Sequence, residues 1–411
     1  MDRTNINLKT GSVIMGEASE TFNILLAGDL CPRMQAENPI LSGNSATMLA
    51  DVMDELSGND LSLINLETPL TEADTPIMKS GPNLKVTPKC IELLKAGGWD
   101  VAVCANNHIG DYGPDVVMET LERLTTADIA AVGAGANREA AEKPLVINKK
   151  GVKTAILAFA ENEFGTADDH TPGANPLLPL RNISQIRAAA ANADITLVLI
   201  HGGNEFNPIP SPRMTETYRA FAEAGASAVI AGHTHCPQGI EIWKGVPIIY
   251  SLSNFLFDTS SIYHGYNWWY GYMVRLGFTA GKAVKLEVIP HHCAPHAEQV
   301  CLLRGEEREK FLIYLDHISR IIADDLEVKK YFDAWCMKNI NGYFARLGIP
   351  FHPTDWNDPA SVSDLMAMRN MFTCEAHNEL TTSTLRILEE RRETEASAYL
   401  PRLLRLCNGE I

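Results

Sequence analysis

The sequence predicts an α/β protein followed by a helical region. Short apolar runs alternate with segments in which apolar residues recur every three to four positions, the pattern of strands alternating with helices. Five of the apolar runs end at side chains that can bind a metal ion. From about Gly305 only the helical period continues. We therefore divide the 411 residues into a tail (1–20), an α/β domain (21–300) and a C-terminal helical region (301–411).

The elements of the α/β domain follow from periodicity and turn residues. Expected strands lie at 22–27, 61–66, 101–105, 195–200, 229–232 and 248–252, with hairpins over 145–159 and 273–289. Expected helices lie at 46–56, 88–96, 114–124, 183–193 and 215–225. The long polar loop 160–178 carries Glu163 and is expected to shape substrate entry. The tail shows no apolar period, and we expect it to be either a loose tail or a short edge strand. We expect four or five helices in the C-terminal region.

The composition argues against several partners and locations. A formal net charge of −16 disfavours nucleic acid and anionic membranes, because both are bound through basic side chains. The nine cysteines include no Cys-x-x-Cys pair, which favours buried thiols in a reducing compartment. No apolar run approaches the ~20 residues that cross a membrane, and no signal-peptide layout is present. We expect a soluble, most simply cytoplasmic, protein without a membrane anchor. The pattern does not predict an oligomeric state.

The metal-binding side chains lie directly after predicted strands. The five strand ends are followed by Asp29, by Glu67, by Asn107 with His108, by His201, and by His233 with His235. Ligands of open α/β sheets bind beyond the carboxyl ends of the strands, so we expect these side chains to meet. Imidazole nitrogen together with carboxylate and amide oxygen suits a hydrolytic site with two metal ions. Each motif alone is weak, since a His-x-His pair is often incidental and Asn often serves turns. A carboxylate such as Glu67 also commonly caps a helix.

The motifs in this order resemble one known family. Gly28-Asp29, Asn65-Leu66-Glu67, Asn106-Asn107-His108, His201-Gly202-Gly203, Gly232-His233-Thr234-His235 and Ser253-Asn254-Phe255 are similar to those of the CapA family. This family of capsule and poly-γ-glutamate synthesis proteins is a branch of the calcineurin-like metallophosphoesterase superfamily. The similarity covers about residues 22 to 290. It implies a four-layer sandwich of two mixed β-sheets flanked by helices, with metals at the strand ends.

The resemblance also implies roles for the motif residues. Asp29 and His235 would hold one divalent ion, Asn107, His201 and His233 the other, and Glu67 would bridge them. The ions would be manganese, iron or zinc, and would activate hydroxide for phosphoester cleavage. His108 would assist the leaving group, with Asp111 orienting its ring. Asn65, Glu205, Asn254 and Lys79 are expected to support the ligands or to meet the substrate, although Lys79 also suits a solvated loop.

One residue departs from the superfamily pattern. Cys31 stands where many relatives have a second ligand, a histidine, in the first motif. A buried thiol is the commoner state of such a cysteine, so we expect no more than a weak ligand role. The site that Asp29 and His235 share would then be the looser of the two.

Three functions are compatible with these motifs. The first is a metal-dependent hydrolase linked to capsule or poly-γ-glutamate metabolism that cleaves a phosphoester in an anionic small molecule or polymer. The second is a metal-dependent γ-glutamyl amide hydrolase or transferase. The third is a non-catalytic subunit for assembly of the polymer. The complete Asn107-His108 and His233-Thr234-His235 motifs favour an enzyme, whereas Cys31 in place of histidine favours the third function.

Overall fold

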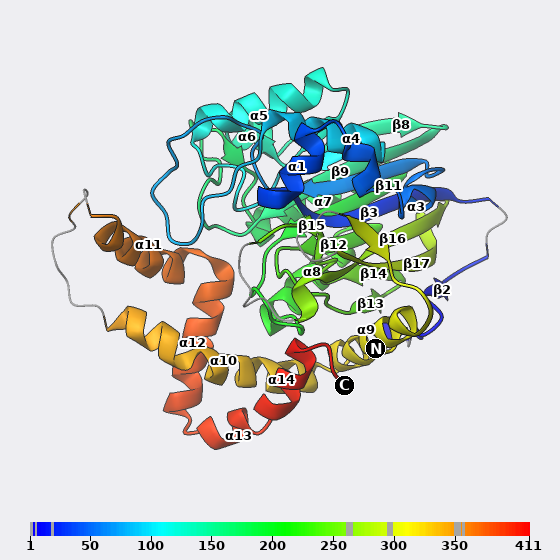
Figure 1. Cartoon of the computed structure of the whole chain (residues 1–411). Coiled ribbons are helices and arrows are strands. Elements are labelled where there is room, and N and C mark those ends of the chain that lie inside the picture. The colour runs from blue at the N-terminus through cyan, green and yellow to red at the C-terminus, as the bar shows by residue number, and fades with distance from the viewer. Residues whose placement is uncertain are drawn as a thin grey trace.

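Two mixed β-sheets form the centre of the protein (Figure 1). The computed structural model describes residues 3–4, 6–17, 20–259, 266–293, 299–348, 355 and 358–411. The chain alternates between strands and helices up to about residue 303 and is helical from Gly305. The prediction of an α/β fold with two mixed sheets flanked by helices is confirmed.

The first sheet has nine strands and contains the N-terminal ligand motifs. Its order is β18 (Val300–Leu302), β17 (Lys282–Cys293), β16 (Tyr270–Thr279), β3 (Phe22–Cys31), β4 (Leu61–Leu66), β5 (Val101–Val103) and β6 (Ala130–Val132). The short β15 (Asn254–Phe257) pairs with β3, and β2 (Ser12–Ile14) pairs with β17. Strands β3, β4, β5 and β6 run parallel, so their carboxyl ends lie at one edge.

The second sheet has seven strands and contains the histidine motifs. Its order is β1 (Arg3–Thr4), β13 (Ile240–Trp243), β14 (Val246–Ile249), β12 (Ala228–Gly232), β11 (Ile195–His201), β9 (Val152–Ala160) and β8 (Leu145–Lys149). Strands β9, β11, β12 and β14 are parallel. A separate pair, β7 (Ala134–Gly135) and β10 (Gly173–Ala174), ties the loop after β9 to the segment that follows β6.

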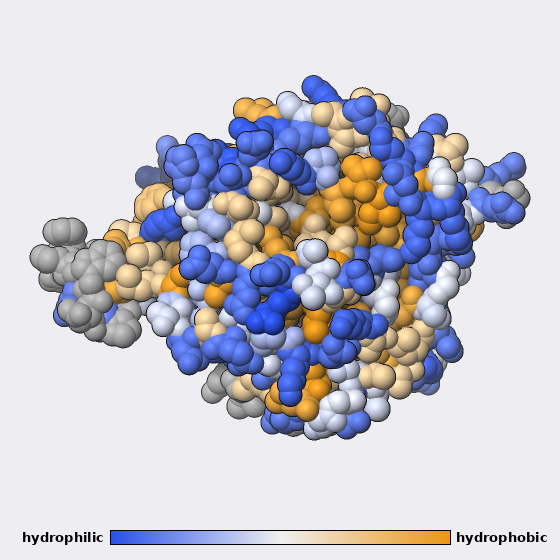
Figure 2. All heavy atoms as spheres, turned by 90° about the horizontal axis from the view of Figure 1, so that it is seen from above, coloured by the Kyte–Doolittle hydropathy of each residue, from blue (hydrophilic) through white to orange (hydrophobic). Residues whose placement is uncertain are grey.

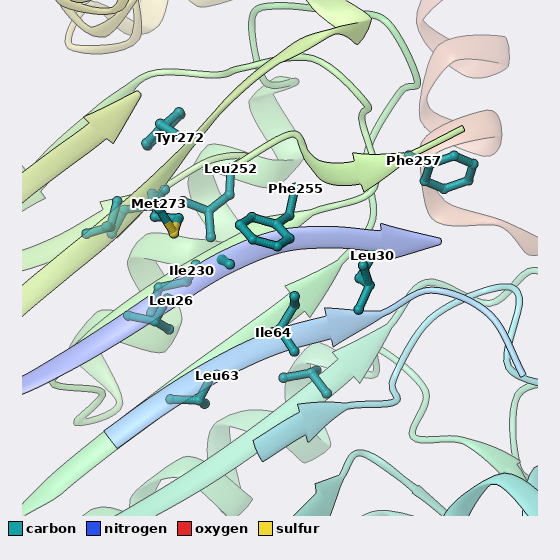
Figure 3. Close-up of a cluster of buried hydrophobic side chains, with 14 of the residues drawn as sticks. Leu26, Leu30, Leu63, Ile64, Ile230, Leu252, Phe255, Phe257, Tyr272 and Met273 are labelled. Atoms are coloured by element: carbon teal, nitrogen blue, oxygen red, sulfur yellow. The ribbon is translucent and has the colours of Figure 1, made fainter. Parts of the chain in front are cut away.

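The alternation of side chains along the strands produces the layers. In β9, Ile156 and Ala158 belong to the apolar cluster between the sheets, whereas Leu157 and Phe159 belong to a second cluster on the opposite face. The first cluster joins Leu26 and Leu63 of the nine-stranded sheet to Ile230 of the other sheet (Figure 3). Packing on both faces explains why these strands are almost continuously apolar.

Helices cover the outer faces of the sheets. Helices α7 (Pro179–Ala190) and α8 (Pro212–Glu223) pack on the second cluster through Ile186, Tyr218 and Phe221. Helices α4 (Ile91–Gly97) and α5 (Pro114–Thr126) pack through their buried apolar side chains on the nine-stranded sheet. Shorter elements are η1 (Met34–Ala36), α1 (Glu37–Leu41), η2 (Pro88–Cys90), α6 (Arg138–Ala141) and η3 (Tyr266–Trp268). The view onto the α5 side shows a mainly hydrophilic face with smaller apolar patches (Figure 2).

Over the described residues, the C-terminal region contains six helices on one side of the sheets (Figure 1), where four or five were expected. They are α9 (Gly305–Ile322), α10 (Asp325–Leu347), α11 (Pro359–Thr373), α12 (Glu375–Glu389), α13 (Glu393–Ser397) and α14 (Leu400–Cys407). Leu312 and Leu315 of α9 belong to the same apolar cluster as the sheets. At the start of α10, Asp325 pairs with Arg219 of α8 at 2.8 Å. The helices therefore pack closely against the α/β part.

One predicted helix differs from the structure. The single helix predicted over 46–56 is two separate turns, α2 (Ser45–Met48) and α3 (Met53–Leu56). Met48, Leu49 and Val52 are all fully buried, and this burial produced the helical spacing in the sequence. The tail contributes the edge strands β1 and β2, in agreement with the expectation of a short edge strand. Over the described ranges, no helix combines the length and apolarity needed to cross a membrane.

Candidate metal centre

The carboxyl ends of parallel strands from both sheets meet at one site. Strand β3 delivers Asp29, which lies opposite Asn65 of β4, and Glu67 follows directly after β4 ends. In the other sheet His201 is the last residue of β11 and lies opposite Gly232 of β12. The structure thus brings together the ligand-type residues that the sequence places at strand ends.

Six predicted ligand residues form two groups that share Glu67. Glu67, His201 and His233 form one group, and Asp29, Glu67 and His235 form the other. In each group the candidate ligand atoms lie within 4.8 Å of one another. The Nε2 atoms of His201 and His235 lie 3.4 and 3.6 Å from Oε1 of Glu67. Asn107 joins the first group, because its Oδ1 lies 3.0 Å from His201 Nε2.

The donor set fits a metal ion because Glu67 is otherwise unsatisfied. Glu67 is fully buried, and among the described residues neither of its carboxylate oxygens has a hydrogen-bond partner. A buried carboxylate without partners is strongly disfavoured. Cations on either side would compensate for this cost. The ligand roles of the six residues stay predictions.

Hydrogen bonds hold several of these side chains in place. Asn65 donates from Nδ2 to Asp29 Oδ1 at 2.7 Å, and the backbone N–H of His233 donates to Asp29 Oδ2 at 3.1 Å. His235 Nδ1 lies 2.8 Å from Asn254 Oδ1. When that nitrogen donates, Nε2 presents its lone pair toward Glu67. Asn65 and Asn254 therefore contact two of the candidate ligands, and their supporting role stays a prediction.

The backbone around the histidines is specialised. His233 has φ 91° and His235 has φ 50°, both in the left-handed region of backbone conformation that residues other than glycine rarely adopt. Gly232 permits the close approach of Asp29, since a Cβ at this position would lie 2.7 Å from Asp29 Oδ1. Strained backbone of this kind concentrates at functional sites.

Burial sets the protonation of the metal-free centre. Burial and the neighbouring Glu67 charge raise the pKa of Asp29 to about 8, and burial raises the pKa of Glu67 well above its ordinary value. Burial also lowers the pKa of His201 to about 4 and that of His233 well below its ordinary range. At neutral pH the imidazoles of His201 and His233 are therefore neutral, which is the form that binds metals. Metal binding would displace protons from the carboxyl groups.

His108 lies beside the centre in a buried chain of polar groups. Its Nε2 is 4.0 Å from Glu67 Oε1, and its Nδ1 is 2.7 Å from Asp111 Oδ2. Lys79 Nζ lies 2.5 Å from Asp111 Oδ1, and the side chain of Lys79 is only 3% exposed. Lys79 is therefore not a solvated loop residue. Burial and the positive charge of Lys79 lower the pKa of His108 to about 4.

The other predicted site residues have different environments. Cys31 is fully buried and belongs to neither ligand group, and burial raises the pKa of its thiol. Asn106 serves the turn, because its Oδ1 accepts from the backbone N–H groups of His108 and Ile109. Glu205 is exposed and lines a pocket that also contains His233. All nine cysteines are free thiols.

Two residues at the centre were not among the predicted ligands. Glu163, in the loop after β9, has Oε1 at 3.6 Å from His233 Nε2 and 3.5 Å from Asn107 Nδ2. Its other oxygen accepts a long hydrogen bond of 3.5 Å from Asn370 of α11. The sequence indicates Glu163 only as a residue of a loop near substrate entry. No sequence motif points to Asn370.

Comparison with known proteins identifies relatives of the α/β part. The model of the family described as bacterial capsule synthesis protein PGA_cap matches residues 23–259. The chain is 29% identical to the capsule biosynthesis protein CapA of Bacillus anthracis over 249 residues, 58% of this chain and 61% of that protein. It is 32% identical to the PGA biosynthesis protein CapA of Bacillus subtilis over 208 residues, 50% of this chain and 53% of that protein. A probable polyglutamine synthesis accessory protein of Mycobacterium tuberculosis is 28% identical over 224 residues, 51% of this chain and 58% of that protein. The matches span less than two thirds of each relative.

Similar solved structures include two from Thermus thermophilus. A hypothetical protein has a TM-score of 0.41 at 16% identity, over 65% of this chain and 98% of that chain. A 5′-nucleotidase precursor has a TM-score of 0.39 at 13% identity, over 69% of this chain and 54% of that chain.

Proposed function

The chain belongs to the bacterial capsule synthesis protein family, and on that premise we propose that it is a metal-dependent hydrolase of phosphoesters. The substrate would be an anionic small molecule or polymer of capsule or polyglutamate metabolism. The observation that carries the proposal is the position of Glu67 between two ligand groups. A shared carboxylate is what a centre of two divalent ions requires.

In this proposal the two groups hold manganese, iron or zinc ions. Asp29 and His235 would bind one ion on one side of Glu67. His201, His233 and Asn107 would bind the other ion on the opposite side. When bound, such ions supply Lewis acidity and activate water for attack on phosphorus. Asn107 contributes a neutral amide oxygen, so the charge of its group comes from Glu67 alone. Asn254 would fix the ring of His235 through the 2.8 Å contact at Nδ1.

His108 would handle the proton of the leaving oxygen. Asp111 is within 2.7 Å of Nδ1 and within 2.5 Å of the Lys79 ammonium, so we assign the Nδ1 proton to the bond with Asp111. This leaves the lone pair of Nε2 on the side of Glu67. The resting ring is neutral; its Nε2 would accept the proton that the attacking water loses and then donate this proton to the leaving oxygen. Asp111 then stabilises the imidazolium, and Lys79 positions Asp111.

A second candidate is hydrolysis of a γ-glutamyl amide at the same centre. The names of the relatives favour it, since they include PGA biosynthesis and polyglutamine synthesis. The ligand geometry supports attack on a carbonyl as well as on a phosphoryl group. A subunit without turnover is the remaining alternative.

Metal analysis and a substrate panel would separate these functions. Purified protein would be assayed for bound manganese, iron and zinc, and with p-nitrophenyl phosphate, bis(p-nitrophenyl) phosphate and γ-glutamyl p-nitroanilide. The matched variants are His233→Ala in the site and His292→Ala on β17 outside it. We expect phosphoester turnover that His233→Ala abolishes and His292→Ala leaves unchanged. Turnover of the anilide alone would favour the second candidate, and full metal content without any turnover would favour the third.

A further inference from the structure

A polar pocket adjoins the candidate metal centre on the side of the C-terminal helices. Its volume is about 410 Å³, and its lining includes His233 and Glu163 from the centre. The opposite wall is built by α10, α11 and α12. These helices lie outside residues 23–259, the range that the family model matches. The pocket therefore combines the family's site with a part of this chain that the match does not cover.

Buried polar contacts hold the helical wall against the centre. Glu375 of α12 accepts hydrogen bonds from the backbone N–H of Asn162 at 2.8 Å and from its side chain at 2.5 Å. Glu379, one turn further on, accepts from Arg213 Nε at 3.1 Å. Arg213 also pairs with buried Glu161 at 2.5 Å. These contacts join α12 to the loop after β9 and to α8 beside the centre.

The lining contains buried polar atoms without protein partners. Asn204, Asn370 and Trp335 line the pocket, and each is at most 6% exposed. Within the described ranges, Asn204 Oδ1, Asn370 Oδ1 and Trp335 Nε1 have no hydrogen-bond partner. Unsatisfied buried groups are costly and call for an explanation such as a ligand or water. Three of them around one pocket beside a candidate catalytic centre favour a ligand.

Arg346 brings a permanent positive charge to this pocket. The metal side of the pocket is acidic, with Glu163 and Glu205, whereas Arg346 on α10 lines the helical side. Over the described residues Arg346 forms no ion pair, and its guanidinium lies 5.6 Å from the centroid of the Tyr343 ring. The hydroxyl of Tyr343 is 2.5 Å from His377 Nδ1. Arg346 is exposed and lies over the Tyr343 ring, and no carboxylate of the described chain neutralises its guanidinium.

We propose that this pocket binds a second anionic group of the substrate, a carboxylate or a phosphate, through Arg346 while the reacting group lies at the metal centre. The proposal rests on the proposed function for the location of the reacting group. Arg presents a planar fork of donors that matches both oxyanions. In a chain with a net charge of −16, such a guanidinium beside the site selects for an anionic group.

Non-hydrolysable phosphonates test the pocket without turnover. Three probes would be compared. Phenylphosphonate carries no remote anion, 4-phosphonobenzoate carries a remote carboxylate, and 1,4-phenylenediphosphonate carries a remote phosphonate. Their affinities for the manganese-loaded full chain would be measured by calorimetry. The variants are Arg346→Gln and the matched control Arg402→Gln. Arg402 likewise lies over a tyrosine ring, at 5.1 Å from Tyr399, without an ion pair among the described residues, and it does not line the pocket.

We expect at least one remote anion to tighten binding roughly tenfold over phenylphosphonate, as a charge-assisted hydrogen bond does. Arg346→Gln should remove this preference, and Arg402→Gln should retain it. Preference for the carboxylate probe or the phosphonate probe identifies the anion. Equal affinities for all three probes, or a preference that survives Arg346→Gln, would overturn the proposal.

The same protein should be assayed with phenyl phosphate, whose hydrolysis does not depend on the pocket. A preference for the remote anion without hydrolysis would reject the phosphoesterase proposal and retain the pocket. Hydrolysis without the preference would reject the pocket and retain the phosphoesterase.

Discussion

The metal-free protein should lose stability as the pH rises, because Asp29 is buried in its protonated form. Its pKa is about 8 in the folded chain, against an ordinary value of 3.8 that the unfolded chain would show. For a carboxyl group with a raised folded pKa, the contribution to stability is fully present below the unfolded value. It is lost as the pH rises toward the folded value, because the unfolded state gives up its proton first.

The size of this effect follows from the two pKa values of Asp29. A difference of one pH unit between the folded and unfolded pKa corresponds to about 1.4 kcal/mol, so between about pH 5 and about pH 8 the free energy of unfolding should fall by about 4 kcal/mol. The pKa of Glu67 is raised as well, which adds to the slope. Bound divalent ions would hold both carboxylates ionised and remove the dependence.

The assay is urea unfolding in EDTA at several pH values across this range, for the wild type and Asp29→Asn. The amide of Asp29→Asn does not titrate. Between about pH 5 and about pH 8, the free energy of unfolding of the variant should therefore fall by about 4 kcal/mol less than that of the wild type. Calorimetry of manganese binding in buffers with different ionisation enthalpies should show release of about one proton more from the wild type at neutral pH. Parallel stability curves for the two proteins would refute the protonated state of Asp29.

Three further predictions address individual residues. His233→Ala or His201→Ala should lower the bound metal measured by elemental analysis, whereas Asn106→Ala should leave it near the wild-type value, because Asn106 bonds to the turn; equal metal content in all three would refute the ligand assignment. Cys31→Ser should leave metal content unchanged, because the buried thiol belongs to neither ligand group; loss of a metal would show that the thiolate is a ligand. Lys79→Met should raise the pKa of His108, since the Lys79 charge lowers it, and should move the acid limb of the pH–rate profile to higher pH. Asp74→Asn removes an exposed loop charge and is the control, which should leave the acid limb in place. An acid limb that does not move in Lys79→Met would exclude the coupling between Lys79 and His108.

The strand ends were predictable from the sequence, and the wall of the pocket was not. Asp29, Glu67 and His201 each follow an apolar run that is buried on both faces, so a linear pattern located them. Glu163 and Asn370 come from a loop and a helix that meet through tertiary packing, and their separation of 207 residues leaves no local signal. The role of Lys79 was undecided for a similar reason. The polar composition of its loop favours a solvent-exposed Lys79, but the contact between Lys79 and Asp111 forms only when the chain folds.

The failed helix prediction has a related cause. Met48, Leu49, Val52 and Leu56 are buried at helical spacing, but the chain between Leu49 and Val52 leaves the helix and returns to it. Burial fixed the spacing of these residues without requiring hydrogen bonds of a continuous helix. Spacing therefore reported which side chains are buried more reliably than it reported the backbone between them.

The left-handed backbone at His233 and His235 has a consequence for protein engineering. Strained residues of this kind each cost on the order of 1–3 kcal/mol, and glycine relieves that cost. Selection of variants for heat resistance in the absence of metal would therefore favour replacing these two histidines. Libraries screened in that way would be enriched in heat-resistant proteins that lack these two candidate ligands. Screening in the presence of the proposed metal ions would reverse the preference, since ion binding at the candidate ligands would then stabilise the fold.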